Sequence, residues 1–494
     1  MQSFGNGTLR RLRVTGGLSS RNLVTKPSGY GQPLQASHPH LFTRKDITPG
    51  ITAEEYEERR KRLMESLPDN SVVVSVAAPI KYMSKNIFYK YRQASDFWYL
   101  TGFEEPNSAV VLEKTSSSKG YRMTLFSSGK DSEKEKWDGA NTGFSDIETS
   151  FGADNAVPIS SFSGQLKSIL SLYSNVYVDV PGESPRRTST TKSILKYLTT
   201  SIRGEKDSVI EAIPSSRRQA LAPEVAKLRA VKSEAEQSLM HQAATISGRA
   251  HAKTMRFASS RQSESALAAH FEYICALNGA QRPAYVPVVA SGGNALIIHY
   301  TSNNHLLAQN DLVLIDAGCE YNGYASDITR TFPASGVFTS AQRDLYSAVL
   351  SVQKQLINLC SEAAGISMQE LHRMSVTLLK QELNQIGFRL GLEGDLERVL
   401  YPHYLSHPIG IDLHESTYFD RNSPLKAGNV ITIEPGVYVP PTPNFPKHFH
   451  NLGVRIEDEV LVGHEHPLVL SSSAPKEIAD VEGACQGLLG FEAY

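Results

Sequence analysis

Two acidic residues, Asp316 and Asp327, straddle a predicted turn within residues 311–333. The runs on either side, DLVLIDAG and ASDITRTFP, are rich in strand-forming residues and predict a β-hairpin. A loop centred on residues 321–322 would place the two acids directly opposite, whereas a loop centred on residues 322–323 would make them diagonal neighbours. Either register leaves both on one face, with Cβ atoms about 5 to 8 Å apart. Carboxylates this close repel unless a proton or cation lies between them, so the pair indicates either a metal site or two solvated acids on an exposed hairpin.

Two further acids lie in apolar surroundings nearer the C-terminus. Glu434 stands in VITIEPGVYV and Glu457 in LGVRIEDEVLV, and carboxylates among strand-forming apolar residues are rarely left unpaired. The preceding stretch, YPHYLSHPIGIDLHE, contains three histidines within twelve positions, a glycine and an aspartate: His403, His407, His414, Gly410 and Asp412. A lone histidine is more often a core or surface residue than a ligand, but this density favours a functional site.

Together these residues make a donor set for two metal ions. The four acids supply four negative charges, which two divalent cations would neutralise, and His407 supplies one neutral nitrogen. Oxygen-rich ligation with a single imidazole suits Mn²⁺ better than a thiolate-seeking metal. Paired metals about 3.5–4 Å apart lower the pKa of a bridging water and polarise a carbonyl group. The chemistry indicated is metal-assisted hydrolysis by a bridging hydroxide.

An alternation of helices and strands has to position these residues. Residues 50–212 show an α/β pattern, with helices expected at 53–67 and 162–172 and strand-like runs at 71–78, 109–112, 122–126 and 176–180. A polar, proline-bearing stretch at 213–223 indicates an interdomain linker. After it, helices are expected at 224–258, 263–277, 341–360 and 368–386, with strand-rich blocks between and beyond them. The pattern predicts an α/β (α+β) chain.

Composition excludes several classes of protein. The 494 residues suffice for at least two domains, and 40% hydrophobic residues exclude global disorder. With 50 Lys+Arg against 51 Asp+Glu, the net charge of −1 gives no sign of nucleic acid or an anionic membrane as the main partner. No apolar run approaches the roughly 20 residues of a transmembrane segment. Four scattered cysteines exclude a disulfide framework and a thiolate zinc site, and the lack of an HExxH sequence disfavours a zincin.

The N-terminus carries its own signal. Residues 1–45 contain no acid and seven basic residues, with many Ser, Thr and Gly between them. An Arg- and Ser-rich, acid-free start predicts a mitochondrial transit peptide over residues 1–45, and a secretory signal is excluded because there is no continuous apolar stretch. The alternative is a basic tail without a targeting role.

Over residues 47–480 the chain resembles the aminopeptidase P branch of the pita-bread metallopeptidases. The resemblance rests on IDAG followed by DITRT, on SH-x-x-G-x-D-x-H, and on the TIEPGVY and GVRIEDEVL strands. Upstream, YRQASDFWYLTGFEEP resembles the signature of that family's N-terminal domain. The resemblance implies a creatinase-like α/β domain over residues 47–212 and a pita-bread catalytic domain over residues 224–480.

The same resemblance implies roles for the ligand residues. Asp316 would hold one metal ion, and His407 and Glu434 would hold the other. Asp327 and Glu457 would bridge the two ions. Glu434 would also orient or deprotonate the bridging water. The implied cofactors are two divalent ions, with Mn²⁺ preferred.

Residues around the substrate are implied too. His299, in IIHYT, resembles the family histidine that contacts the substrate near the cleaved bond, and His414 would hydrogen-bond the developing oxyanion. His403 would line the far side of the leaving residue.

Three other residues match the family's pattern with two interpretations open. Arg421 and Arg455 match arginines near the site and would be structural or carboxylate-directing, although an ordinary ion pair is an equal alternative. Asp96 would reach across a subunit interface toward substrate, or serve only as a loop or cap residue.

The leader and the segments that follow it resemble mitochondrial intermediate-cleaving peptidases, which remove one N-terminal residue from imported proteins. We therefore expect an enzyme that acts on peptide or protein N-termini, in the matrix or peripherally on the inner membrane, as a dimer or tetramer. Alternatives are an Xaa-Pro aminopeptidase that needs a penultimate proline, a prolidase restricted to dipeptides, and a non-catalytic module. The last is disfavoured because every expected ligand is intact.

Overall fold

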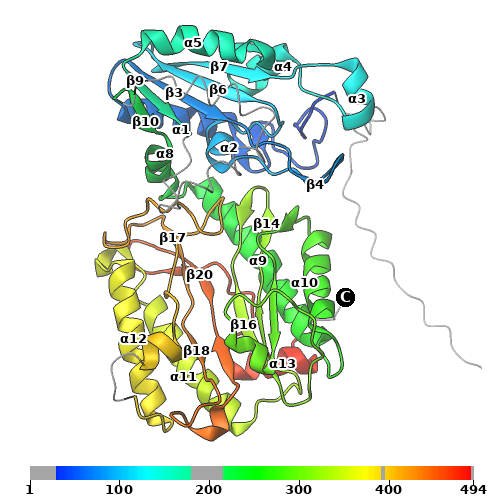
Figure 1. Cartoon of the computed structure of the whole chain (residues 1–494), viewed down its shortest axis with the longest axis vertical. Helices are drawn as coiled ribbons and strands as arrows, with labels where there is room; N and C mark the ends of the chain where they lie inside the picture. Colours follow the sequence, from blue (N-terminus) through cyan, green and yellow to red (C-terminus); the bar gives the residue numbers. More distant parts are fainter. Residues whose placement is uncertain (1–28, 180–213, 215, 391–394, 491–494) are drawn as a thin grey trace, which may run out of the picture.

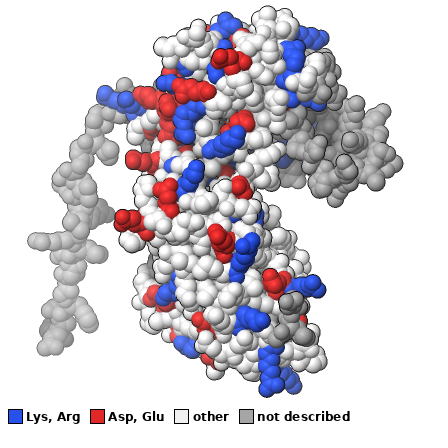
Figure 2. Space-filling view, turned by 90° about the vertical axis from the view of Figure 1, so that its left-hand side faces the viewer, with Lys and Arg blue, Asp and Glu red and all other residues white. Residues whose placement is uncertain are grey.

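The computed structural model describes residues 29–179, 214, 216–390 and 395–490. They form two lobes stacked along the long axis of the molecule, with helix α8 (Ala222–Arg229) between them (Figure 1). Lys and Arg are interspersed with Asp and Glu over the face drawn in Figure 2, in keeping with the balanced net charge. Among the helices described, none has the length and apolarity needed to cross a membrane.

The N-terminal lobe is built on a six-stranded sheet of order β10-β9-β3-β6-β7-β8. Its strands and those of two small hairpins are β1 (Asp46–Thr48), β2 (Ile51–Thr52), β3 (Ser71–Val76), β4 (Tyr82–Ser84), β5 (Ile87–Phe88), β6 (Ala109–Lys114), β7 (Tyr121–Ser127), β8 (Asn155–Pro158), β9 (Asn175–Val178) and β10 (Arg218–Ala220). Its helices are α1 (Ala53–Ser66), α2 (Ser95–Thr101), α3 (Ser132–Asp138), α4 (Phe144–Phe151) and α5 (Phe162–Leu172). Both sheet faces are covered: Val73 packs in the cluster that contains α1, whereas Val72 and Val74 pack in the cluster that contains α5.

Residues 29–45 belong to this lobe. The Gln32 side chain donates to the Gly102 carbonyl at 2.9 Å and accepts from the Glu104 amide at 2.7 Å, and Leu34 and Phe42 are buried. The folded lobe therefore starts earlier than the predicted leader boundary at residue 45. Of the predicted leader, residues 1–28 lie outside the described residues.

The prediction of a linker at 213–223 was wrong for its described part. Arg218–Ala220 form β10, which pairs in parallel with β9, and residues from Ala222 onward begin α8. The three residues Arg-Gln-Ala are too few to show a strand periodicity of their own, and the hydrogen-bonding edge of β9 decides their conformation. Residues 180–213, the end of the predicted N-terminal domain, lie outside the described part of the chain.

The C-terminal lobe places strands between two pairs of helices, with α9 and α10 on one side and α11 and α12 on the other (Figure 1). The helices are α9 (Glu234–Phe257), α10 (Glu264–Leu277), α11 (Ser340–Ile357), α12 (Met368–Gln385) and α13 (Ile478–Gln486). The strands are β11 (Arg282–Pro283), β12 (Val288–Ser291), β13 (Leu312–Asp316), β14 (Cys319–Tyr321), β15 (Tyr324–Ala325), β16 (Thr329–Pro333), β17 (Val430–Ile433), β18 (Gly436–Tyr438), β19 (Gly453–Arg455), β20 (Asp458–Leu461) and β21 (Leu468–Val469). One large apolar cluster runs through the strands and the helices that cover them.

The expected helix at 224–258 is two helices, α8 and α9, separated at residues 230–233. Ser233 starts the second with a capping box: its hydroxyl accepts from the Glu236 amide at 3.2 Å, and the Glu236 carboxylate accepts from the Ser233 amide at 2.9 Å. This cap starts a new helix inside the continuous helical periodicity of residues 224–258, so α8 is a separate helix between the lobes.

The predicted hairpin at 311–333 is confirmed, and its register is the second of the two considered. Tyr321 pairs with Tyr324 across a two-residue turn whose residues, Asn322 and Gly323, have φ of 48° and 86°. Such positive φ values at both turn positions favour Asn-Gly. The same register pairs Asp316 with Thr329, so Asp316 and Asp327 are diagonal neighbours.

Candidate active site

A cavity of ≈ 670 Å³ opens in the C-terminal lobe. Every predicted site residue except Asp96 lines it, namely His299, Asp316, Asp327, His403, His407, His414, Arg421, Glu434, Arg455 and Glu457. Residues up to 158 positions apart in the chain (from 299 to 457) therefore converge on one volume.

Strand pairing brings the ligand-type residues to this cavity. Asp316 ends β13, Glu434 follows β17, and Glu457 lies between β19 and β20. The Glu457 amide donates to the carbonyl of Thr329 in β16 at 3.1 Å, which joins the C-terminal strands to the hairpin. The segment that carries His407 runs beside β17, because the Thr432 amide donates to the His407 carbonyl at 2.9 Å.

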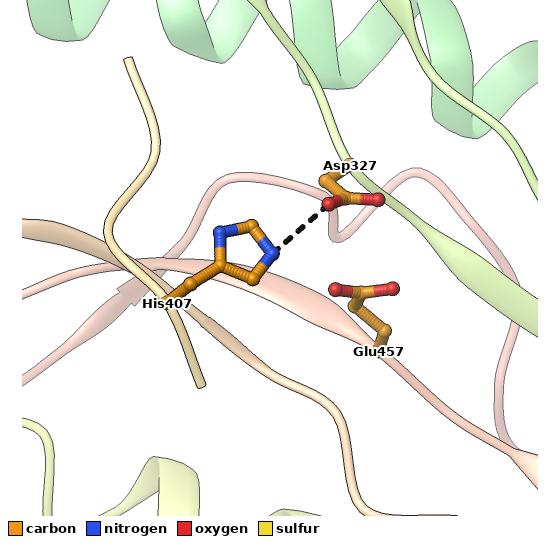
Figure 3. A group of neighbouring side chains, drawn as sticks. All are labelled: Asp327, His407 and Glu457. Carbon is orange, nitrogen blue, oxygen red and sulfur yellow. Dashed lines mark ion pairs between the residues drawn. The ribbon is translucent and has the colours of Figure 1, made fainter. Parts of the chain in front are cut away.

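Asp327, His407 and Glu457 are the most closely grouped of these side chains. Each offers a ligand atom within 4.8 Å of the other two, and all three are buried. The imidazole of His407 points at the carboxylate of Asp327, with Glu457 beside them (Figure 3), and His407 Nε2 lies 3.2 Å from Asp327 Oδ2. Glu434 Oε1 lies 3.8 Å from the same nitrogen.

The protonation of His407 shows what kind of group these side chains can hold. Its Nδ1 faces the Pro408 carbonyl at 3.2 Å, and since a carbonyl only accepts, Nδ1 carries the hydrogen. Burial lowers the pKa of His407, so the ring is neutral and Nε2 presents a lone pair to the carboxylates of Asp327 and Glu434. A lone pair facing carboxylate oxygens is stable only with a cation or proton between them. The donors present therefore fit a divalent metal ion.

The pKa shifts of the buried acids also indicate a site for a cation. Burial, reinforced by Asp316, raises the pKa of Asp327 well above its ordinary value. Burial and then Glu457 raise the pKa of Glu434, and burial and then Asp327 raise that of Glu457. These carboxylates can all be ionised at neutral pH only when positive charge is supplied from within the cavity.

Tyr285 joins the two hairpin acids and was not predicted. Its hydroxyl contacts Asp316 Oδ1 at 2.5 Å and Asp327 Oδ1 at 2.6 Å. Burial, followed by these two acids, raises the pKa of Tyr285 well above its ordinary value, so the hydroxyl stays a donor. Its setting, RPAYVPV, carries no motif; a tyrosine hydroxyl in an apolar stretch signals only that some partner exists.

Arg455 forms a buried ion pair with Asp316, with Nη2 to Oδ2 at 2.6 Å, at the edge of the cavity. Its Nη1 donates to the hydroxyl of Tyr438 at 2.7 Å and its Nε to Thr329 at 3.1 Å. The Thr329 hydroxyl in turn donates to Glu457 Oε2 at 2.6 Å. Arg455 thus orients one predicted ligand directly and a second through one hydroxyl.

The remaining histidines surround this centre. His414 stacks at an angle on His407, with ring centroids 4.2 Å apart, and burial followed by His407 lowers the pKa of His414 to about 4. His403 donates from Nδ1 to the Tyr404 carbonyl at 2.8 Å and accepts at Nε2 from Tyr438 at 2.9 Å. His299 lies on the exposed side of the cavity. Neutral His414 can donate a hydrogen bond at physiological pH.

The last two predicted residues differ in placement. Arg421 lines the cavity with its guanidinium 4.4 Å from the ring centroid of Tyr404. Asp96, in the first turn of α2, lies outside the cavity lining and accepts from Arg229 Nη1 at 2.6 Å. A role for Asp96 across a subunit interface stays a prediction.

Two family models match the chain. Residues 238–464 match metallopeptidase family M24, and residues 56–177 match the aminopeptidase P N-terminal domain. The two matches fall on the two lobes.

Characterised relatives align over nearly the whole chain. Intermediate cleaving peptidase 55 of Saccharomyces cerevisiae is 39% identical, covering 94% of this chain and 90% of the relative. Human Xaa-Pro aminopeptidase 3 is 35% identical, with coverage of 93% and 91%. A crystal structure of the Saccharomyces cerevisiae Icp55 lacking its N-terminal 58 residues superposes with a TM-score of 0.78 at 37% identity, covering 89% of this chain and 99% of that one. Aminopeptidase P of Escherichia coli with the inhibitor Pro-Leu gives a TM-score of 0.78 at 32% identity, with the same coverage. The chain therefore belongs to metallopeptidase family M24 and, with its aminopeptidase P N-terminal domain and pita-bread catalytic domain, is a metallo-aminopeptidase.

Proposed function

We propose that this enzyme is a dinuclear-metal aminopeptidase that removes a single N-terminal residue from peptides and from imported mitochondrial proteins after presequence cleavage. The observation that carries the proposal is the unprotonated Nε2 of His407 facing the carboxylates of Asp327 and Glu434. A neutral imidazole and four acids in one cavity are donors for two divalent ions, with Mn²⁺ the preferred metal.

In this proposal Asp316 would hold one ion, His407 and Glu434 would hold the other, and Asp327 and Glu457 would serve both. When bound, the ions would supply a hydroxide nucleophile at neutral pH and polarise the scissile carbonyl. The protein contributes ligand geometry through Tyr285, Arg455 and Thr329, which hydrogen-bond the ligand carboxylates.

Proton handling falls to residues on the cavity wall. Glu434, whose Oε1 lies 3.8 Å from His407 Nε2, would accept the proton released by the attacking water and return it to the amine that leaves when the peptide bond breaks. His414, neutral at physiological pH, donates a hydrogen bond to the oxyanion that develops on the substrate carbonyl. His299, on the exposed side of the cavity, would contact the substrate near the cleaved bond, and His403 would line the far side of the leaving residue.

The relatives support the substrate class, because their names include both intermediate cleaving peptidase 55 and Xaa-Pro aminopeptidase 3. The second name and the Pro-Leu inhibitor of the Escherichia coli structure favour a second candidate, an enzyme that needs a penultimate proline. A prolidase restricted to dipeptides is the third. For location we propose the mitochondrion, matrix or peripheral inner membrane, since the Arabidopsis thaliana relative is named mitochondrial. The leader would end before residue 29, and the assembly would be a dimer or tetramer.

A substrate panel with a metal measurement tests this proposal. The purified enzyme is assayed on matched oligopeptides with alanine or proline at the second position and on an Xaa-Pro dipeptide. Cleavage of both oligopeptides supports the main candidate, cleavage of the proline peptide alone supports the second, and cleavage of the dipeptide alone supports a prolidase.

Asp327→Ala tests the ligand assignment in the same assay. It should abolish hydrolysis and lower the bound metal measured by elemental analysis, whereas Asp344→Ala, on the exposed face of α11, should leave both unchanged. A fully active, fully metallated Asp327→Ala enzyme would contradict the bridging role.

A further inference from the structure

A single arginine gathers three acids where the two lobes meet. Arg229, at the C-terminal end of α8, has a side chain only 5% exposed. Its Nε and Nη2 donate to the two oxygens of Glu415 at 3.0 and 2.9 Å, its Nη2 also donates to Asp412 at 2.7 Å, and its Nη1 donates to Asp96 at 2.6 Å. Two of these acids come from the catalytic lobe and one from α2 of the N-terminal lobe.

The N-terminal lobe adds a second anchor to the same segment. Ser95 in α2 donates to Asp412 Oδ1 at 2.6 Å, and Arg92 donates from Nη2 to the carbonyl of Ile411 at 2.7 Å. Arg92 Nε also donates to Glu320 in β14 at 2.6 Å. These contacts give a physical purpose to the YRQASDFW stretch, whose polar residues do not line the catalytic cavity.

The segment held in this way, residues 408–415, carries one histidine of the site and directly follows another. It begins next to His407 and contains His414, and it closes on itself through a Glu415 amide donating to the Pro408 carbonyl at 2.9 Å. Gly410 has no room for a side chain, since a Cβ there would lie 2.9 Å from Glu415 Oε1. Because Arg229 holds the Glu415 carboxylate in place, this carboxylate cannot move aside to make room for a side chain at position 410. The Gly and Asp of the SH-x-x-G-x-D-x-H motif are therefore explained by this anchoring and not by contact with substrate.

We infer that Arg229, together with Arg92 and Ser95, positions the catalytic histidines: the N-terminal lobe and α8 set the placement of His407 and His414 by clamping residues 408–415. Arg229 does not line the catalytic cavity and reaches residues 408–415 through Glu415 and Asp412, so it is a positioning residue. A displacement of about 1 Å in a reacting group can cost about 100-fold in rate. The inference rests on the proposed role of His414.

Replacing Arg229 by methionine keeps an unbranched stem in the buried position and removes the forked donors. In the full-length, metal-loaded enzyme, Arg229→Met should lower kcat by about 100-fold with a change in KM of less than about threefold. Deuterium exchange of a peptide spanning residues 407–416 should rise at least tenfold. Arg229→Lys, which keeps the charge but loses the bidentate contact with Glu415, should recover part of both.

Arg60→Met is the matched control. Arg60 is buried like Arg229, but its guanidinium donates to two carbonyls and a hydroxyl that all belong to the N-terminal lobe. It should lower stability without raising exchange in residues 407–416. A folded Arg229→Met enzyme with wild-type kcat and unchanged exchange overturns the inference.

If Arg229→Met does not fold, Arg92→Met decides the matter, because Arg92 is 36% exposed. It should lower kcat at least fivefold and raise exchange at residues 409–415, and failure to do so overturns the inference. His414→Ala is measured alongside. If that variant keeps full activity, the proposed role of His414 fails; if it is inactive while the arginine variants are not, only the positioning role fails.

Discussion

Removing the hydroxyl of Tyr285 is the most direct test of how the carboxylates proposed as metal ligands are held. The hydroxyl lies 2.5 Å from Asp316 Oδ1 and 2.6 Å from Asp327 Oδ1, and it has only one hydrogen. It can therefore donate to one carboxylate at a time, so the other must be protonated or face a cation. Tyr285→Phe removes this donor and leaves the ring volume almost unchanged.

The size of the effect follows from the kind of bond lost. A hydrogen bond to a charged group contributes about 1.5–3 kcal/mol, and partners of metal ligands typically contribute about 10- to 100-fold in metal affinity. Without the hydroxyl, Asp316 and Asp327 repel each other and lose their common orientation. We expect Mn²⁺ to bind Tyr285→Phe about 10- to 100-fold more weakly, with a similar fall in kcat/KM at limiting metal.

The assay compares chelator-stripped wild-type and variant enzymes by calorimetric titration with Mn²⁺ at pH 7, followed by peptide hydrolysis at increasing metal concentration. Saturating metal should restore most of the variant's activity if the hydroxyl acts through the ligands. Tyr346→Phe is the matched control, because its hydroxyl donates to the Lys476 carbonyl at 2.7 Å in the same lobe and its residue is absent from the cavity lining. Wild-type metal affinity and kcat/KM in Tyr285→Phe would refute the reasoning.

Three further outcomes are expected. Burial lowers the pKa of His251 to about 4, so between pH 6.5 and 4 the unfolded chain binds a proton that the folded chain does not. The free energy of unfolding should therefore decrease by up to about 3 kcal/mol as the pH is lowered through this range. Urea titrations in EDTA should show a smaller decrease for His251→Gln. Glu264 accepts from the Ser291 amide at 2.8 Å and from the His305 amide at 2.9 Å, and these two contacts hold the loop that carries His299. Glu264→Ala should therefore lower kcat/KM about 10- to 100-fold in steady-state assays. Unchanged kinetics would show that Glu264 does not position His299. A chain that starts at residue 46 should have an unfolding free energy about 3–6 kcal/mol lower than one that starts at residue 29, because it lacks the buried side chains of Leu34 and Phe42. Coincident urea transitions of the two chains would contradict this.

Helices whose signals are local were predicted within a few residues. Thr339 and Ser367 each begin a helix with a capping box, at α11 and α12, and Ser263 caps α10. Caps and apolar periodicity act between residues three or four positions apart, so they can be read along the chain. The same logic failed at Ser233, where a cap was overlooked inside an apparently continuous pattern.

Segments whose conformation depends on distant partners were not predicted. β10 is a strand because β9 offers it a hydrogen-bonding edge, and residues 29–45 are folded because Gly102 and Glu104 bind Gln32. Neither partner is close in the chain. Polar composition alone favoured a linker and a leader at these places.

What the sequence determined by itself was the chemistry of the donors: four acids, histidines at family spacing and strand-forming neighbours that exclude water. Only the tertiary structure decided which hairpin register holds Asp316 and Asp327, that Tyr285 lies between them, and that Asp96 binds Arg229 outside the cavity. The physical reason is that ligand character is a property of each side chain, whereas distance and protonation depend on how strands more than a hundred residues apart pack together and bury charge.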